Sequence, residues 1–81
     1  MDSVFLLSQL PPGGCGKVSA LLTDEQRKER LAHLGLVQNA YVECVGQSPL
    51  GDPRAYSICG ATIALRREES ALIQLSDVNL P

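Results

Sequence analysis

Four side chains in this sequence are of types that bind transition metals through sulfur or nitrogen: Cys15, Cys44, Cys59 and His33. Three cysteines and one histidine are a ligand set that zinc accepts in principle. The spacings contain no CxxC pair, and an odd number of cysteines is a poor framework for disulfides. We therefore treat these residues as weak metal candidates, predict reduced thiols and expect no bound cofactor.

Catalysis needs groups that converge, and the sequence offers few of them. His33 is the only histidine, and it falls near the end of a predicted helix, where a cation interacts favourably with the helix terminus. The neighbouring carboxylates of Glu68 and Glu69 suit capping and solvation better than acid–base chemistry. The glycines before Lys17 resemble part of a phosphate-binding loop, but the loop is too short and Val18 replaces its hydroxyl residue. We expect the protein not to be an enzyme.

The remaining functional candidates are surface residues suited to binding another protein. Arg27, Arg30 and Arg66 are expected to be exposed, and the planar donors of arginine suit carboxylates. Leu50 and Asp52 lie in a segment, residues 49–53, that consists almost wholly of turn-forming residues and presents Leu50 on a stiff backbone. A solvated charged face and a rigid hairpin connection are the structural alternatives for these two groups.

Five short strands and one helix must position these residues. The alternation of apolar and polar residues predicts strands over residues 17–22, 41–46, 54–58, 61–65 and 71–75, with a helix over residues 24–34. Residues 4–10 are expected to form one helical turn capped by Ser8, and residues 76–81 a frayed tail. Asn39 is expected to take a positive φ before the second strand.

The helix carries the strongest local signals. Thr23 and Gln26 fit a capping box at its start. The Thr23 hydroxyl is expected to accept from the Gln26 backbone N–H, and the Gln26 side chain to reach back to the Thr23 backbone N–H. Gly35 stands one residue past its end, where a left-handed conformation is needed. Leu36 is then placed to fold back on Leu31, as in a Schellman motif.

Size and charge narrow the class further. The chain has 81 residues, room for one domain over residues 1–81. Its net charge of −2 gives no basic excess for phosphate contacts, so we expect no nucleic-acid binding. Its longest apolar run is too short to span a bilayer and its first residues lack the basic region of a secretory signal, which predicts a cytoplasmic protein. Five short strands with one inserted helix favour a mainly β fold, a small closed barrel without exposed edges.

The ordered landmarks resemble the FeoA family, small cytoplasmic proteins of bacterial ferrous iron uptake. The landmarks are Leu7-Ser8-Gln9-Leu10 with Pro12-Gly13, Arg30-Leu31 with Leu34-Gly35-Leu36, Val42, Pro49-Leu50-Gly51-Asp52-Pro53, Ile63-Ala64-Leu65-Arg66, and Glu69, Ala71 and Ile73. Each piece is common by itself, but the ordered set with these spacings is rare. The resemblance covers a matching core over residues 7–75.

The resemblance implies a five-stranded SH3-like barrel with one inserted α-helix. It also implies a partner, the cytoplasmic GTP-binding portion of the ferrous iron permease FeoB, which would hold the protein at the inner face of the membrane without direct insertion. Weak homo-oligomerisation is compatible with it. Two alternatives are a regulatory barrel module like the carboxy-terminal domain of iron-dependent repressors of the DtxR type, and a small metal carrier.

Overall fold

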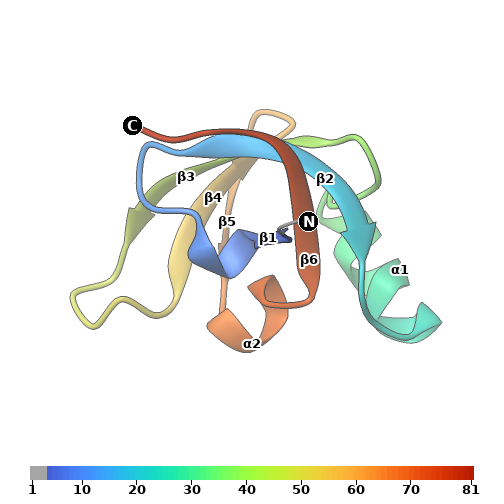
Figure 1. Cartoon of the computed structure of the whole chain (residues 1–81). Coiled ribbons are helices and arrows are strands. Elements are labelled where there is room, and N and C mark those ends of the chain that lie inside the picture. Colours follow the sequence, from blue (N-terminus) through green and yellow to red (C-terminus); the bar gives the residue numbers. More distant parts are fainter. Residues whose placement is uncertain (1–3) are drawn as a thin grey trace.

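A computed structural model describes residues 4–81, and Figure 1 shows a strongly curved sheet with two helices below it. In chain order the elements are β1 (Phe5–Leu6), the 3₁₀ turn η1 (Leu7–Gln9), β2 (Cys15–Leu21), α1 (Glu25–His33), β3 (Tyr41–Gln47), β4 (Arg54–Ile58), β5 (Ala61–Leu65), α2 (Arg67–Ser70) and β6 (Ile73–Asn79).

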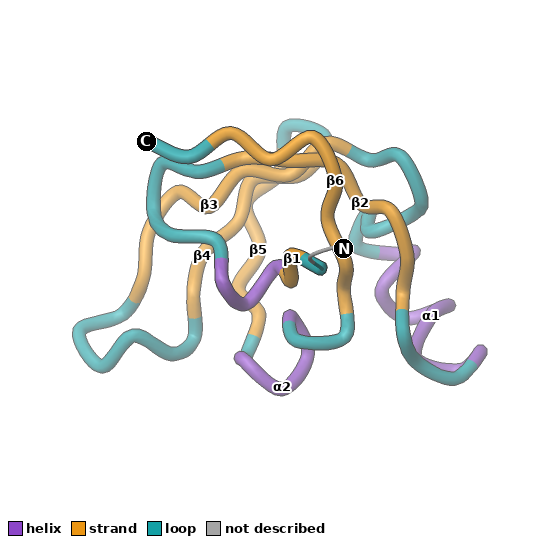
Figure 2. Tube along the Cα trace, in the orientation of Figure 1, coloured by secondary structure: helices purple, strands orange, loops and turns teal. Residues whose placement is uncertain are grey.

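The strands form one antiparallel sheet in the order β1-β6-β2-β3-β4-β5 (Figure 2). Its tightest connection is Cys59–Gly60, where φ is 52° and 83°, so that Ile58 pairs directly with Ala61. Two positive φ values match the right-handed twist of the flanking strands. The predicted mainly β class is confirmed, and the strands at residues 54–58 and 61–65 begin and end where the sequence placed them.

The sheet has six strands where the sequence predicted five. The extra strand is β1, in which Phe5 pairs with Leu75 and Leu6 with Gln74. Two residues are too few to show an alternating pattern, so this strand exists because β6 offers a free edge. The helical turn η1 follows directly, with Leu6 as its N-cap residue, so the predicted cap at Ser8 is wrong.

The predicted frayed tail is also wrong. The last strand, β6, runs to Asn79, and its second half continues the ladder with β2: Ser76 pairs with Lys17, and Asn79 with Cys15. Because the hydrogen bonds come from the partner strand, residues 76–79 are ordered without an alternating apolar pattern of their own.

Within residues 4–81 no ladder joins β1 to β5, so the barrel is not closed by hydrogen bonds between strands as the sequence predicted. The turn η1 takes that place, because side chains of β4 reach across to it. The guanidinium Nη1 of Arg54 donates to the carbonyl oxygens of Leu10 at 2.6 Å and Ser8 at 3.3 Å, and the Tyr56 hydroxyl donates to that of Leu7 at 3.5 Å.

The helix α1 is one residue shorter at each end than the predicted range 24–34, with Leu34 as its C-cap. Its N-cap is Asp24, not Thr23, and Asp24 Oδ1 accepts from the Arg27 N–H at 2.8 Å. At its end Gly35 has φ 96°, its N–H donates to the Ala32 carbonyl, and the Leu36 N–H donates to the Leu31 carbonyl. This pair of bonds is the predicted Schellman motif. The positive φ predicted for Asn39 is confirmed at 74°.

The core is aliphatic, as the composition predicted, with one buried tyrosine and one buried cysteine. Its members are Leu7, Leu10, Val18, Leu31, Leu36, Val42, Cys44, Tyr56, Ile58, Leu65, Ile73 and Leu75. Every strand from β2 to β6 contributes, and α1 contributes a single fully buried side chain, Leu31. The helix is therefore held to the sheet at one point and by its C-terminal motif, which leaves space beside it.

Candidate docking surface

The loop between β3 and β4 presents the most exposed large apolar side chain that the structure describes. Leu50 is 93% exposed at its tip. The loop closes on itself through two backbone bonds, from the Ser48 N–H to the Pro53 carbonyl at 3.1 Å and from the Gly51 N–H to the Ser48 carbonyl at 2.8 Å. Leu50 is thus presented on an internally bonded backbone, which lowers the entropy that a partner must remove on binding.

Asp52 ties this loop to the short helix α2. Its Oδ1 accepts from the Arg67 N–H at 2.9 Å, which satisfies one of the free donors at the start of α2. The preceding residue, Arg66, is exposed, and its backbone N–H donates to Glu69 Oε1 at 3.3 Å. Asp52 therefore has a structural role that the sequence did not predict, while the Arg66 side chain lies free at the surface for contact.

Arg27 and Arg30 line a recess of about 340 Å³ between α1 and α2, with Leu31 and Leu72 among its walls. Arg30 Nη2 lies 3.2 Å from Glu69 Oε2, with the two side chains 74% and 31% exposed. Glu69 therefore caps α2 with one oxygen and pairs with Arg30 through the other. The predicted capping role of this carboxylate is observed, and each of its two oxygens accepts one hydrogen bond.

All five predicted docking residues belong to elements on one side of the sheet: the β3–β4 loop, α2 and α1, which follow one another along the lower side of Figure 1. We call Arg27, Arg30, Leu50, Asp52 and Arg66 the α2-side surface. Bonds connect its parts, from Asp52 to the start of α2 and from Glu69 to Arg30. It combines exposed guanidinium groups with one exposed leucine, which suits an acidic and partly apolar partner.

The four weak metal candidates lie in four different settings. Cys44 is buried in the core, Cys59 is exposed at the β4–β5 turn, and His33 is exposed in the last turn of α1. The thiol of Cys15 is 3.1 Å from the hydroxyl of Tyr41. Among residues 4–81 no group of three or more potential metal-ligating residues is placed to hold an ion.

The contact between Cys15 and Tyr41 changes the chemistry of the phenol. The hydrogen bond with the Cys15 thiol raises the pKa of Tyr41 above its ordinary value of 10.0. The pair acts as a link between β2 and β3.

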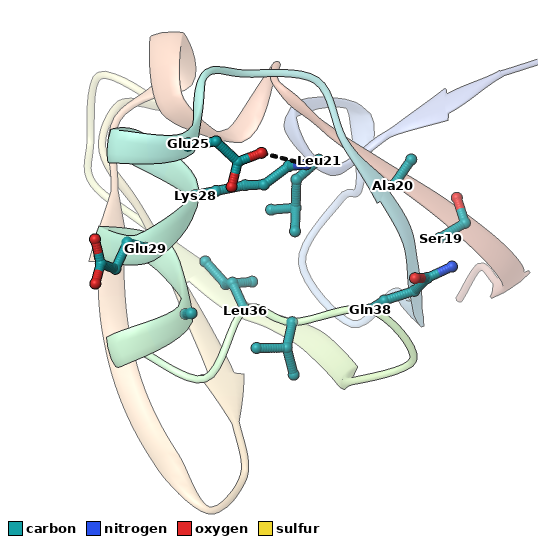
Figure 3. A pocket seen from close by; sticks show the side chains of 10 residues that line it. Ser19, Ala20, Leu21, Glu25, Lys28, Glu29, Leu36 and Gln38 are labelled. Atoms are coloured by element: carbon teal, nitrogen blue, oxygen red, sulfur yellow. Dashed lines mark ion pairs between the residues drawn. The ribbon is translucent and has the colours of Figure 1, made fainter.

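A larger groove, which the sequence did not predict, lies between α1 and β2. It has a volume of about 760 Å³, and Figure 3 shows α1 along one side, Ser19 to Leu21 of β2 along the other, and Leu36 between them. Its lining comes from three segments: residues 19–21, residues 25–32 and residues 36–38. The sequence carried only a partial signal for this groove. The helix has a single strongly apolar residue on the face toward the core, which is too little to cover the strand beside it.

Within residues 4–81 the longest apolar stretch of helix falls short of what a membrane span requires.

Comparison with known proteins gives a consistent result. Residues 5–77 match the family model described as FeoA domain. The solution structure of an FeoA protein from Chlorobium tepidum has 30% sequence identity and a TM-score of 0.79, and the match covers 94% of this chain and 70% of that one. No curated protein sequence gives a significant match.

Two more distant structures share the fold. The zinc complex of Stenotrophomonas maltophilia FeoA, described as an SH3 domain protein, has 23% identity and a TM-score of 0.80, covering 94% of this chain and 96% of that one. A manganese-dependent transcriptional repressor has 18% identity and a TM-score of 0.81, covering 94% of this chain and 37% of that one. The predicted SH3-like fold is thereby confirmed.

Proposed function

Because this chain belongs to the FeoA family, which is linked to ferrous iron transport, we propose that it is a non-enzymatic accessory protein of bacterial ferrous iron uptake. Its partner in this proposal is the cytoplasmic GTP-binding portion of a permease of the FeoB type. The protein works in the cytoplasm, at the inner face of the membrane, through that partner. The Stenotrophomonas protein of the same fold is itself described as a candidate activating factor of ferrous iron transport.

One observation carries the docking step: Leu50, 93% exposed, stands on an internally bonded loop that Asp52 ties to the start of α2. A large apolar side chain in this position costs solvation free energy unless a partner covers it. Arg27 and Arg66 lie exposed on the same side and add donors for carboxylates. Asp52 accepts from the Arg67 N–H and so caps α2; its part in docking is to hold the β3–β4 loop against the start of this helix.

The test is a binding measurement with the soluble GTP-binding domain of the permease, loaded in turn with GDP and with a non-hydrolysable GTP analogue. We expect the wild-type protein to bind one of these states measurably. Leu50→Asp should weaken binding at least about tenfold, the scale of a truncated interface anchor. Val45→Asp is the matched control, because Val45 is also a half-exposed apolar residue but lies outside the α2-side surface.

Two results would count against the proposal. Absence of binding in both nucleotide states would remove the permease domain as the partner. A folded Leu50→Asp protein that binds like the wild type would remove the β3–β4 loop from the interface. Arg27→Glu then tests the other half of the α2-side surface, with Lys17→Glu, at an exposed residue of β2, as its charge-matched control.

A second candidate is a regulatory barrel module of the repressor type. The observation that favours it is the fold shared with a manganese-dependent repressor, of which this chain spans 37%. Such a module would bind a peptide or another domain and would have no affinity for the permease. The same binding experiment, run with a repressor that lacks its own barrel, separates the two functions.

A further inference from the structure

The groove between α1 and β2 borders a strand edge whose neighbour has ended. The β2–β3 ladder pairs Cys15, Gly16 and Lys17 with β3. Val18 adds two bonds: its N–H donates to the Ala40 carbonyl, and its carbonyl accepts from the Asn39 N–H. The chain then turns away at Asn39, where φ is 74°. On this side Ser19–Leu21 have no strand next to them within residues 4–81, and these are the residues that line the groove.

The ladder on the other side of β2 shows where the free backbone groups point. The Leu22 N–H donates to the Leu72 carbonyl at 2.6 Å, and Leu21 pairs with Ile73. In an antiparallel ladder, alternate residues turn their N–H and C=O groups to opposite edges. Because Leu22 faces β6, the N–H and C=O of Leu21 face the groove. This edge therefore offers a donor and an acceptor to an incoming backbone.

Side chains around this edge are apolar at the base and charged at the mouth. Leu36 is buried below, and Val37 remains 45% exposed. Two carboxylates, Glu25 and Glu29, and one ammonium group, Lys28, line the α1 side. Lys28 Nζ lies 3.5 Å from Glu25 Oε2, and the Glu25 side chain is 93% exposed (Figure 3). Since the carboxylates outnumber the ammonium, the mouth carries a net negative charge.

We propose that this groove binds an extended, basic segment of a partner protein by strand addition to Ser19–Leu21. The partner backbone bonds to Leu21, an apolar side chain covers Val37, and a Lys or Arg pairs with Glu25 or Glu29. Main-chain bonds supply affinity and alternate side chains supply specificity in this mode of recognition. The volume of about 760 Å³ lies within the usual range of binding pockets, about 300–1,000 Å³. The identity of the partner rests on the proposed docking function, whereas the mode of binding does not.

The test uses isotope-labelled protein and a defined probe, the peptide acetyl-Lys-Val-Thr-Val-Thr-Val-amide, followed by NMR. We expect shift changes at Leu21 and Val37, and amide exchange at Leu21 slowed about tenfold or more at saturation, because a bonded amide exchanges only when it opens. The peptide with Glu in place of Lys should bind about twofold to fivefold more weakly, the range of one exposed ion pair. Glu25→Lys should reverse that preference. Glu68→Lys should leave it unchanged, because Glu68 belongs to α2 and lines the recess between α1 and α2, not the groove.

Three results would overturn the proposal. The first is no shift at Leu21 at millimolar peptide. The second is a shift at Val37 with unchanged exchange at Leu21, which indicates a helical or side-chain-only occupant. The third is a shift that follows protein concentration without peptide, which indicates a second copy of the chain. Failure of the permease domain to bind would leave these results untouched, so the two proposals fail separately.

Discussion

Arg54 holds the N-terminal turn against the sheet: its Nη1 is 2.6 Å from the Leu10 carbonyl oxygen and 3.3 Å from that of Ser8. Arg54 is in β4 and Leu10 follows η1, so one charged side chain spans the opening that no strand pair closes. Arg54→Met keeps the length of the side chain but removes its donors. We expect it to cost about 1–3 kcal/mol, because the carbonyl oxygens lose charge-assisted bonds. Urea unfolding measures this, with exposed Arg66→Met as a control that should change little. Equal midpoints for the two variants would contradict a bracing role.

Leu31 attaches α1 to the core almost alone. It is the single buried residue of the helix, and Leu34, three residues on, is exposed. Leu31→Ala should lower the free energy of unfolding by about 2–5 kcal/mol, while Leu34→Ala should stay within about 0.5 kcal/mol. The measurement is the urea midpoint with a common slope. A loss at Leu34 as large as that at Leu31 would show that a second leucine on this face holds the helix to the core.

Gly35 combines a left-handed backbone with a close neighbour. Its φ is 96°, and a Cβ there would lie 3.0 Å from Ile58 Cγ2. Gly51 has a similar φ of 83° with open space around it. Gly35→Ala should therefore cost more than Gly51→Ala, which carries backbone strain alone, of the order of 1 kcal/mol. Thermal unfolding of both variants checks this order, and the reverse order would rule out the contact with Ile58 as a cause.

Tyr56 makes stability depend on alkaline pH. It is fully buried, and this burial raises the pKa of its phenol above the ordinary value of 10.0. As pH rises the unfolded chain loses this proton first, so above about pH 10 it binds fewer protons than the folded protein. The stabilisation is complete below that pH and is lost as pH rises through the folded-state pKa. The urea midpoint of the wild type should fall more steeply between about pH 10 and pH 11 than that of Tyr56→Phe. Parallel slopes would contradict this.

Cobalt titration tests the metal-carrier alternative directly. Cys15, Cys44, Cys59 and His33 lie in the β2 strand, the core, a β-turn and the end of α1. Since these side chains do not gather at one point, reduced protein with one equivalent of Co²⁺ should show no thiolate-to-cobalt absorption. A strong band at one equivalent, lost in Cys15→Ser, would mean that the thiols do converge on an ion.

Local patterns in the sequence were enough to predict the Schellman motif at Gly35, the positive φ at Asn39, and the strands at residues 54–58 and 61–65. Each of these depends on residues within about five positions of one another, because helix caps, turns and strand alternation are short-range. The order of landmarks along the chain was also sufficient to indicate the family and with it the SH3-like fold.

Only the tertiary structure decided which backbone edges are paired and which are free. The strand β1 and the second half of β6 are ordered by partners about 60 to 70 residues away in the chain, so no local pattern marks them. Asp52 caps a helix 15 residues further on, and the groove beside β2 exists because β3 turns away at Asn39 while α1 buries only one side chain, Leu31. Such features arise where segments that are distant in the sequence meet in space. The spacing of residues along the chain does not show which segments meet.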